Sequence, residues 1–428
     1  MGSADSLTAV RGSIPPQALT DSYAATTYAA PYTPADFHRA GRVDPVRRAP
    51  LTPSPEVLSR LAACAEVADR SGEPDREAVA VLRESGLLAL VVPKSHGGAG
   101  ADAVALNSCV EQVASVNASA AIMLFQHCAV TSRIVENGSP AQHREVLPRL
   151  AGGQWLAASA WSESGAGAAK KNLSTLARRT ADGGWLLDGA KSFTTSAGLA
   201  DVYLVLAQSQ EPEEESRGDE PAASDSSSKD TGYGAAGQTF FLIPGDNPGL
   251  LPDTSLRLAG MRGSATGFVS VRECRVPDTA RLGATGVAAS IIARVRNSGA
   301  SLGAVAVGIA QAALDAAHEH ASRRGLHAHQ AVRHRLVDLT TQVETARAVV
   351  ERAGRRTSAD PGLTTLHSKL AASATAERVV ADVAQFLGSA GYVETHPINR
   401  FGRDARAVAL MGPTNDLCKE LVSLSWNR

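Results

Sequence analysis

The sequence predicts an α+β protein with an N-terminal helical domain, a middle antiparallel β domain and a C-terminal four-helix bundle. Apolar residues recur at helical spacing between Ser54 and Leu150 and again after Gly283. Between these regions lie short segments rich in β-branched and aromatic residues, separated by turn residues. We therefore expect a flexible N-terminal arm followed by three domains, at residues 1–50, 51–154, 155–283 and 284–428.

Length and composition exclude several classes of protein. The chain has 428 residues, a net charge of -1 and a hydrophobic content of 44%, so neither a disordered chain nor a nucleic-acid-binding surface is expected. Its apolar runs are shorter than the ~20 residues that span a bilayer, and its N-terminus has no apolar signal segment. The five cysteines are scattered and form no CxxC pair, which argues against disulfides and a metal site. We expect a cytoplasmic protein without a membrane or nucleic-acid partner.

The N-terminal helical domain shows clear helix boundaries. Ser54 is a predicted N-cap with Pro55 in the first turn. A second predicted helix covers 76–84 and ends before a Ser-Gly pair, and helical spacing then continues over 104–150. Residues 1–50 are rich in Ala, Pro, Ser and Thr without a sustained period, which is typical of a flexible arm.

The middle domain carries one insert. Predicted strands cover 173–178, 185–187, 192–195, 202–207, 239–243 and 268–271. The segment from Ser209 to Asp230 contains eight acidic and two basic residues and no aromatic residue. Such a stretch cannot bury enough apolar surface to order itself. We therefore expect a disordered acidic insert over 209–236.

Four helical stretches form the predicted bundle, at 287–324, 330–353, 364–387 and 404–423. Their alanine content suits close packing of helix on helix. The first stretch is longer than an average helix, so we expect a break near Gly299 or Gly303.

Four short motifs stand out along the chain. The first, WSESGAG at 161–167, holds a glycine-rich turn that can bring backbone N–H groups close to an electron-rich ligand. The second, LDGAKSFTTSAG at 187–198, carries Phe193, which can stack on a planar ring. The third, GMRGSAT at 260–266, mostly shapes the β domain, and the fourth, QFLGSAG at 385–391, has glycines that let the backbone approach a ligand closely.

In this order the motifs resemble those of the acyl-CoA dehydrogenase superfamily, whose patterns are TEPGAGSD, LNGxKxWITNAG, GMRxSxT and QxxGGxG. The resemblance covers about residues 54–425 and implies the three-part fold and FAD as cofactor. It implies that one group of residues binds the flavin half of FAD, with the hydroxyl or the backbone N–H of Thr195 near the flavin nitrogen that receives hydride. This group comprises Trp161, Ser162, Gly167, Phe193, Thr194 and Thr195.

The resemblance also implies that the adenine half of FAD contacts a neighbouring subunit, so that the protein is a homodimer or homotetramer. The residues implied there are Gln385, Gly388, Ser389 and Thr414, with Arg323 and Arg324 as candidates for an arginine of the second bundle helix.

Both positions where the superfamily carries its catalytic base lack a carboxylate. The Glu of the family motif YEGT corresponds to Gly412, and the alternative Glu on the first bundle helix corresponds to Ser298. A base elsewhere is one explanation. Glu163 lies in the first motif, where the family also has a Glu that it does not use as its base, and Asp416 lies close to Gly412 along the chain. Since general-base catalysis is worth about 10²–10⁴-fold in rate, the catalytic residues stay unassigned at this point.

Three functions remain open. The leading one is FAD-dependent α,β-dehydrogenation of an acyl thioester that is bound to coenzyme A or to a carrier protein. The second is a flavin-dependent monooxygenase on the same fold, which uses reduced flavin and O2 and needs no carboxylate, with His127 as a candidate residue. The third is a non-catalytic flavin-binding protein. Two departures from the family, Gly299 and the pair Ala168-Ala169, weaken a standard coenzyme A substrate. The sequence identifies neither the substrate nor the electron acceptor or flavin reductase.

Overall fold

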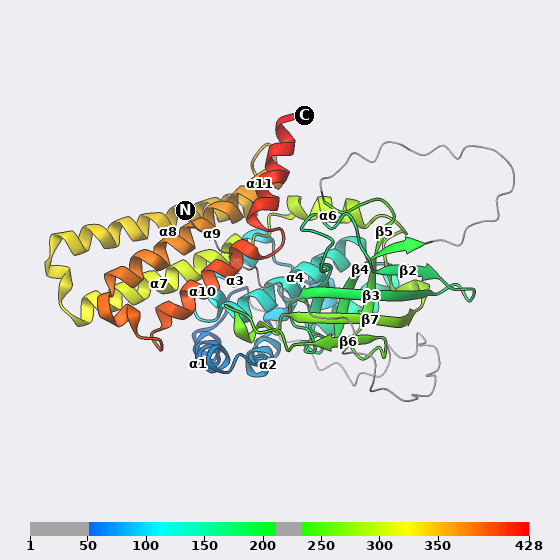
Figure 1. The fold of residues 1–428 in the computed structure, drawn as a ribbon, viewed down its shortest axis with the longest axis horizontal. Helices are drawn as coiled ribbons and strands as arrows, with labels where there is room; N and C mark the ends of the chain where they lie inside the picture. Colours follow the sequence, from blue (N-terminus) through cyan, green and yellow to red (C-terminus); the bar gives the residue numbers. More distant parts are fainter. Residues whose placement is uncertain (1–50, 211–232, 428) are drawn as a thin grey trace, which may run out of the picture.

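The computed structural model describes residues 51–210 and 233–427 and confirms the predicted order of helices, sheet and helices (Figure 1). The first region consists of α1 (Pro55–Ser71), α2 (Arg76–Ser85), α3 (Ala103–Ala114), α4 (Ala118–Asn137) and α5 (Pro140–Ala151). The predicted arm at residues 1–50 lies outside the described residues and stays a prediction.

Side-chain caps explain where the first helices begin. The Ser54 hydroxyl accepts a hydrogen bond from the backbone N–H of Val57 at the start of α1, as predicted. The carboxylates of Asp75 and Asp102 cap α2 and α3 in the same way, which satisfies backbone donors that the helix itself leaves free. By length and composition α4 is apolar enough to cross a membrane, but 78% of that window is buried inside the protein. It is therefore the core helix of this domain.

The sheet of the middle domain is mixed, which corrects the expectation of a purely antiparallel one. Its strands are β1 (Ala157–Ala160), β2 (Leu176–Arg179), β3 (Trp185–Thr194), β4 (Val202–Gln210), β5 (Gln238–Pro244), β6 (Leu250–Asp253), β7 (Gly267–Val276) and β8 (Arg281–Leu282). The spatial order is β6-β7-β3-β2-β4-β5-β8. One edge of β4 pairs with β5, and the other pairs in parallel first with β1 and then with β2. Turn residues between adjacent segments signal hairpins, whereas parallel pairs join segments that are distant in sequence.

Among the described residues, ordered structure extends into both ends of the insert that we expected at 209–236. β4 continues to Gln210, with Gln208 paired to Gln238 of β5. At the other end Tyr233 is buried, and the backbone N–H of Gly234 donates to the carbonyl of Ala169. Residues 211–232 lie outside the described residues.

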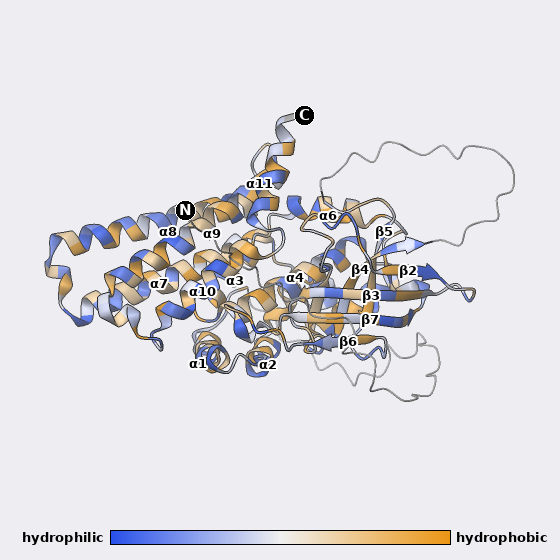
Figure 2. Cartoon of the chain, in the orientation of Figure 1, coloured by the Kyte–Doolittle hydropathy of each residue, from blue (hydrophilic) through white to orange (hydrophobic). Residues whose placement is uncertain are grey.

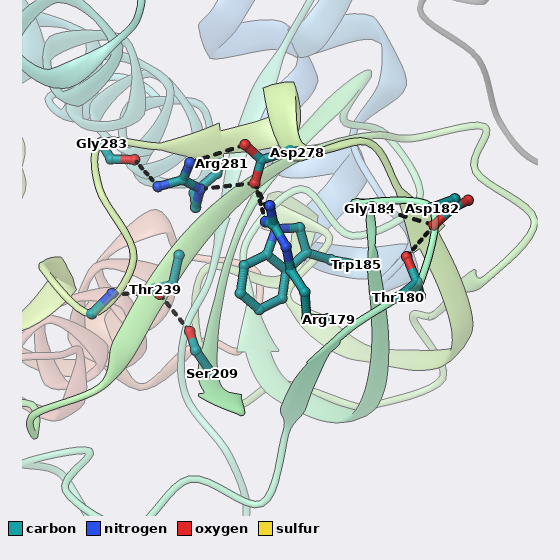
Figure 3. Close-up of polar contacts among 11 residues, drawn as sticks. Arg179, Thr180, Asp182, Gly184, Trp185, Ser209, Thr239, Asp278, Arg281 and Gly283 are labelled. Atoms are coloured by element: carbon teal, nitrogen blue, oxygen red, sulfur yellow. Dashed lines mark hydrogen bonds and ion pairs between the residues drawn. The ribbon is translucent and has the colours of Figure 1, made fainter. Parts of the chain in front are cut away.

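A cluster of polar side chains that hydrogen-bond to one another surrounds Asp278, shortly after β7 (Figure 3). The Asp278 carboxylate accepts hydrogen bonds from the Trp185 indole N–H at 2.9 Å, from Arg281 at 3.0 Å and from Arg179. Hydrogen bonds from Arg281, followed by those from Trp185 and Arg179, hold the pKa of this carboxylate well below its usual range. We refer to Asp278, Trp185, Arg179 and Arg281 as the Asp278 cluster.

The C-terminal region confirms the break in the first helical stretch and corrects the last one. The elements are α6 (Ala288–Val295), α7 (Gly303–Arg323), α8 (Gln330–Arg355), α9 (Pro361–Phe386), α10 (Pro397–Leu410) and α11 (Asn415–Ser423). A 3-10 turn and Gly299, with φ of +80°, separate α6 from α7. The stretch expected at 404–423 is two helices, because Pro413 lacks the N–H that a continuous helix needs.

Helix α8 of the bundle buries one face. Figure 2 shows hydrophilic and hydrophobic residues alternating along α8. Its buried residues, Leu336, Leu339, Val343, Ala346 and Val350, fall three or four positions apart and pack in the core shared by the first and third regions.

Candidate active site

The three regions meet around a cavity of about 1370 Å³. Its wall combines α4, the segment after β1, the end of β3, α6, α9 and the connection between α10 and α11. Small-molecule sites are typically clefts of about 300–1,000 Å³. The cavity is therefore large enough for more than one small ligand side by side.

The first motif contributes directly to this wall. Trp161, Ser162 and Gly167 all line the cavity. The Trp161 ring lies 4.8 Å from the Phe240 ring and 4.9 Å from the Arg133 guanidinium carbon. Its indole N–H is buried without a hydrogen-bond partner. Because an unpaired buried donor is costly, this N–H marks a place where a ligand can supply an acceptor.

The second motif is split between the cavity and the core. Phe193 and Thr195 line the cavity, whereas Thr194 is fully buried and does not. Phe193 is 64% exposed and has φ of +53°, a conformation that a bulky residue rarely adopts. The Thr195 hydroxyl lies 3.2 Å from that of Thr266, in the third motif. Phe193 thus presents its ring at the cavity without being held there by core packing.

The residues implied for the adenine half of FAD lie elsewhere, except for Thr414. Thr414 lines the cavity and caps α11. Arg323, Arg324, Gln385, Gly388 and Ser389 do not line it. Lys369 of α9 lines the cavity, and Gln385 follows it by about 24 Å along the helix at 1.5 Å per residue.

These remaining residues gather at the far end of the bundle. The His320 ring, one turn before Arg323 and Arg324, lies 6.0 Å from that of Phe386, next to Gln385. Arg323 also acts electrostatically on His396, just before α10, whose pKa is lowered by burial and then by this guanidinium. One protomer thus presents the two predicted groups of FAD contacts at opposite ends of α9.

Both expected base positions face the cavity, and neither holds a carboxylate. Gly412 and Ser298 are part of its lining. Asp416 is 93% exposed and pairs with Lys419, so it does not replace them. Within the described residues, the carboxylates that line the cavity are Asp102, Glu136 and Glu163.

Glu163 is fully engaged in a buried ion pair. Its carboxylate accepts from Lys191 at 2.6 Å and from the N–H and hydroxyl of Ser174 and the N–H of Thr175. Burial by itself raises the pKa of Glu163, but the Lys191 ammonium and these donors outweigh it and lower the pKa to about 2. Glu163 therefore stays ionised and holds the loop after β1 in place.

The structure does not bring His127 to the cavity, which corrects the expectation of a catalytic role. Its side chain is fully buried, with Nε2 at 2.9 Å from the Leu88 carbonyl and Nδ1 accepting from the N–H of Ala157 at 3.1 Å. Burial lowers the pKa of this imidazole to about 4. His127 connects α4 to β1 and has no free ring nitrogen.

Three buried cationic side chains of the cavity wall were not among the residues expected from the sequence. Arg133 is buried, and burial lowers its pKa to about 10. Lys369 donates to the carbonyls of Met411 and Pro413, and burial lowers its pKa to about 8. Lys170 is 4% exposed and donates to the Tyr233 hydroxyl at 2.8 Å. The signal that could have found Lys369 is a lone charge on the apolar face of a helix, since charges are almost never buried without a partner.

Comparison with known proteins agrees with this architecture. Three protein-family models, described as the N-terminal, middle and C-terminal domains of acyl-CoA dehydrogenase, match residues 57–154, 158–274 and 286–424. A probable acyl-CoA dehydrogenase, FadE25 of Mycobacterium tuberculosis, is 32% identical over 84% of this chain and 89% of its own.

Two further relatives carry more specific names. The L-prolyl-[peptidyl-carrier protein] dehydrogenase of Pseudomonas fluorescens is 31% identical over 80% of this chain and 88% of its own. The structure of butyryl-CoA dehydrogenase from Megasphaera elsdenii superposes with a TM-score of 0.75 at 26% identity, covering 87% of this chain and 97% of that one.

Fold, cavity and motifs thus define a flavin-dependent oxidoreductase. The chain belongs to the acyl-CoA dehydrogenase family, and FAD is the cofactor that goes with this membership. The residues present fit that group. Trp161 supplies an unpaired buried donor at the cavity, and a Cβ added at Gly167 would meet nothing within 4 Å, so the glycine-rich turn leaves open space for a ligand.

Proposed function

We propose that the protein oxidises an acyl thioester between its α and β carbons, with the acyl group carried by coenzyme A or by a carrier protein. The observation that carries this proposal is the cavity itself, which joins the flavin motifs to both positions where the family places its base. When bound, FAD would supply the oxidant for this reaction, as acceptor of the hydride from the β carbon.

The chain's own residues have separate tasks in this proposal. Trp161, Phe193 and Thr195 would hold the flavin ring, with the Trp161 N–H as a hydrogen-bond donor, Phe193 as an aromatic surface and the Thr195 hydroxyl as a further polar contact. Lys369 donates hydrogen bonds to the carbonyls of Met411 and Pro413 and so fixes the position of the cavity wall around Gly412. The residues at the far end of α9, Arg323 and Gln385 among them, bind FAD of a second protomer in a homodimer or homotetramer. The described cysteines are all free thiols, which supports a place in the cytoplasm.

Anaerobic reduction of the bound flavin tests the proposed function. Purified FAD-loaded protein is mixed with a panel of coenzyme A and carrier-protein thioesters while the absorbance of oxidised flavin is followed. Bleaching is the expected result. Absence of bleaching with every thioester, together with a hydroperoxide absorbance when the chemically reduced protein meets O2, would instead establish the monooxygenase.

A further inference from the structure

A side chain from another part of the cavity wall lies close to the position of the missing base. A Cβ added at Gly412 would meet one side chain within 4 Å, the ammonium nitrogen of Lys170 at 3.8 Å. Gly412 does not have a left-handed backbone conformation, so neither strain nor crowding explains the glycine. The Lys170 side chain reaches the position that the family's carboxylate would fill.

Lys170 does not stand alone at this position. Its ammonium donates to the Tyr233 hydroxyl oxygen at 2.8 Å, and both side chains are less than 10% exposed and line the cavity. Lys170 has φ of +53°, a left-handed conformation that is unusual for a residue with a long side chain. Such backbone strain persists where the surrounding structure maintains it, and it is concentrated at functional sites.

The carboxylates of the wall do not compete for the role of base. Glu163 has both oxygens engaged with Lys191, Ser174 and Thr175. Asp102 caps α3 by accepting from the N–H of Ala105. Glu136 is exposed to solvent. Among the described residues, Lys170, with Tyr233 as its partner, is the acid–base group that a side chain at Gly412 would meet. The buried ammonium of Lys369 also lies beside Gly412, but it is held by the carbonyls of Met411 and Pro413.

We infer that Lys170 and Tyr233 replace the missing glutamate, with the Tyr233 oxygen as the catalytic base and Lys170 as its positioning residue. This inference rests on the proposed function. In this role the Tyr233 oxygen takes up the proton as a phenolate, and the Lys170 ammonium at 2.8 Å supplies the counter-charge, a charge-assisted contact that is stronger in a buried site than in water.

Electrons and protons balance in this step. The α C–H bond breaks and its proton passes to the Tyr233 oxygen. The β C–H bond breaks and its hydride passes to oxidised FAD. The electron pair left at the α carbon forms the new double bond, and Lys170 stays protonated throughout.

The first test compares Tyr233→Phe with the wild-type protein. The change removes one oxygen and keeps the ring, and we expect flavin reduction by the best thioester to slow by about 10²–10⁴-fold, the usual worth of a general base. Exchange of the α hydrogen with deuterium in a phenylacetyl thioester, which has no β hydrogen to transfer, measures proton removal separately and should slow in parallel. Lys171→Met is the matched control, because this exposed lysine is the next residue and does not line the cavity.

The second test addresses Lys170 through a signal that a purely structural role would not move. In the FAD-free protein, the ultraviolet difference absorbance of one phenolate is titrated with pH in the wild type, Tyr233→Phe and Lys170→Met. We expect the signal to be absent from Tyr233→Phe and shifted to higher pH in Lys170→Met. Among the described residues, the charged groups that act on the pair include Arg133, which interacts electrostatically with Tyr233, and Lys191, which does so with Lys170 and is itself neutralised by Glu163.

The third test restores a carboxylate. A Cβ at Gly412 would meet only the flexible end of the Lys170 side chain, at 3.8 Å, and this end can shift when a longer side chain is introduced. We expect Gly412→Glu to recover at least about tenfold of the rate lost by Tyr233→Phe when the two are combined, a part of what a general base contributes.

The outcomes separate the inference from the proposed function. Slow reduction and slow α-hydrogen exchange in Tyr233→Phe, with normal rates in Lys171→Met, establish the pair as the base. Wild-type rates in Tyr233→Phe would overturn the inference and leave the dehydrogenase standing. If no thioester bleaches the wild-type flavin and none exchanges its α hydrogen, both fall together.

Discussion

The Asp278 cluster and the cavity wall each contain one tryptophan of the middle region, so the two sites can be compared directly. The indole N–H of Trp185 donates to Asp278 at 2.9 Å, within a cluster where Arg179 and Arg281 also bind that carboxylate. The indole N–H of Trp161, beside the cavity, is buried and has no partner. Both rings lie under an arginine, 4.9 Å from its guanidinium carbon in each case.

This difference teaches how to distinguish polar groups that hold the fold from those that await a ligand. Leaving a buried donor unpaired costs about 1–3 kcal/mol, so the unpaired Trp161 N–H at the cavity wall marks a place where a ligand can supply the acceptor. The Asp278 cluster is complete without a ligand and lies away from the cavity lining. The cavity wall contains polar groups that have partners within the protein, such as Glu163 with Lys191, and polar groups that have none, such as the Trp161 N–H.

The largest expected effect comes from breaking the completed ion pair inside the cavity wall. Glu163→Gln keeps the shape of the side chain but leaves the fully buried Lys191 ammonium without its counter-charge. We expect the free energy of unfolding, measured by urea denaturation near neutral pH, to fall by about 3–5 kcal/mol. An unchanged free energy of unfolding would contradict the interpretation that this ion pair, like the Asp278 cluster, stabilises the fold.

The same pair predicts an acid sensitivity. The pKa of Glu163 falls from 4.5 to about 2 on folding, so the folded state binds fewer protons than the unfolded state between these values. The contribution of Glu163 to stability is therefore complete above about pH 4.5 and is lost as the pH falls through about 2. Glu163→Gln should lack this part of the pH dependence.

A matched pair of substitutions sharpens the comparison of the two tryptophans. Trp185→Phe removes a hydrogen bond of the Asp278 cluster, and we expect a loss of about 1–3 kcal/mol in the free energy of unfolding with unchanged FAD affinity. Trp161→Phe removes a donor that the protein itself does not use, and we expect little change in the stability of the FAD-free protein. Its FAD dissociation constant, from flavin fluorescence titration, should rise about tenfold, equivalent to ~1.4 kcal/mol. The reverse assignment of effects would overturn the comparison.

The smallest effect is expected at the vacated base position. Gly412→Ala adds a Cβ whose nearest neighbour is 3.8 Å away, so the free energy of unfolding should stay within about 0.5 kcal/mol of the wild type. Thermal unfolding of the FAD-free protein measures this. A large loss would mean that the glycine serves the fold and that the carboxylate is absent for lack of space.

Local sequence was sufficient for much of the fold and for one side of the site. The helix start at Ser54 follows from a cap, and the break at Gly299 follows from a glycine within a long periodic stretch. The motif at 161–167 lines the cavity because its members are neighbours in one loop. The expectation for His127 failed because a histidine in sequence shows neither its burial nor its two hydrogen-bond partners.

The sequence by itself determined the family, the cofactor and the absence of a carboxylate at Gly412 and Ser298, because periodicity and short motifs depend on residues that are close along the chain. Only the tertiary structure decided what stands in that place. Lys170 and Tyr233 are separated by 63 positions, and their contact across from Gly412 exists because the loop after β1, the segment before β5 and the connection between α10 and α11 pack around one cavity. Such a meeting of side chains depends on how the regions are folded against one another, and no local pattern encodes it.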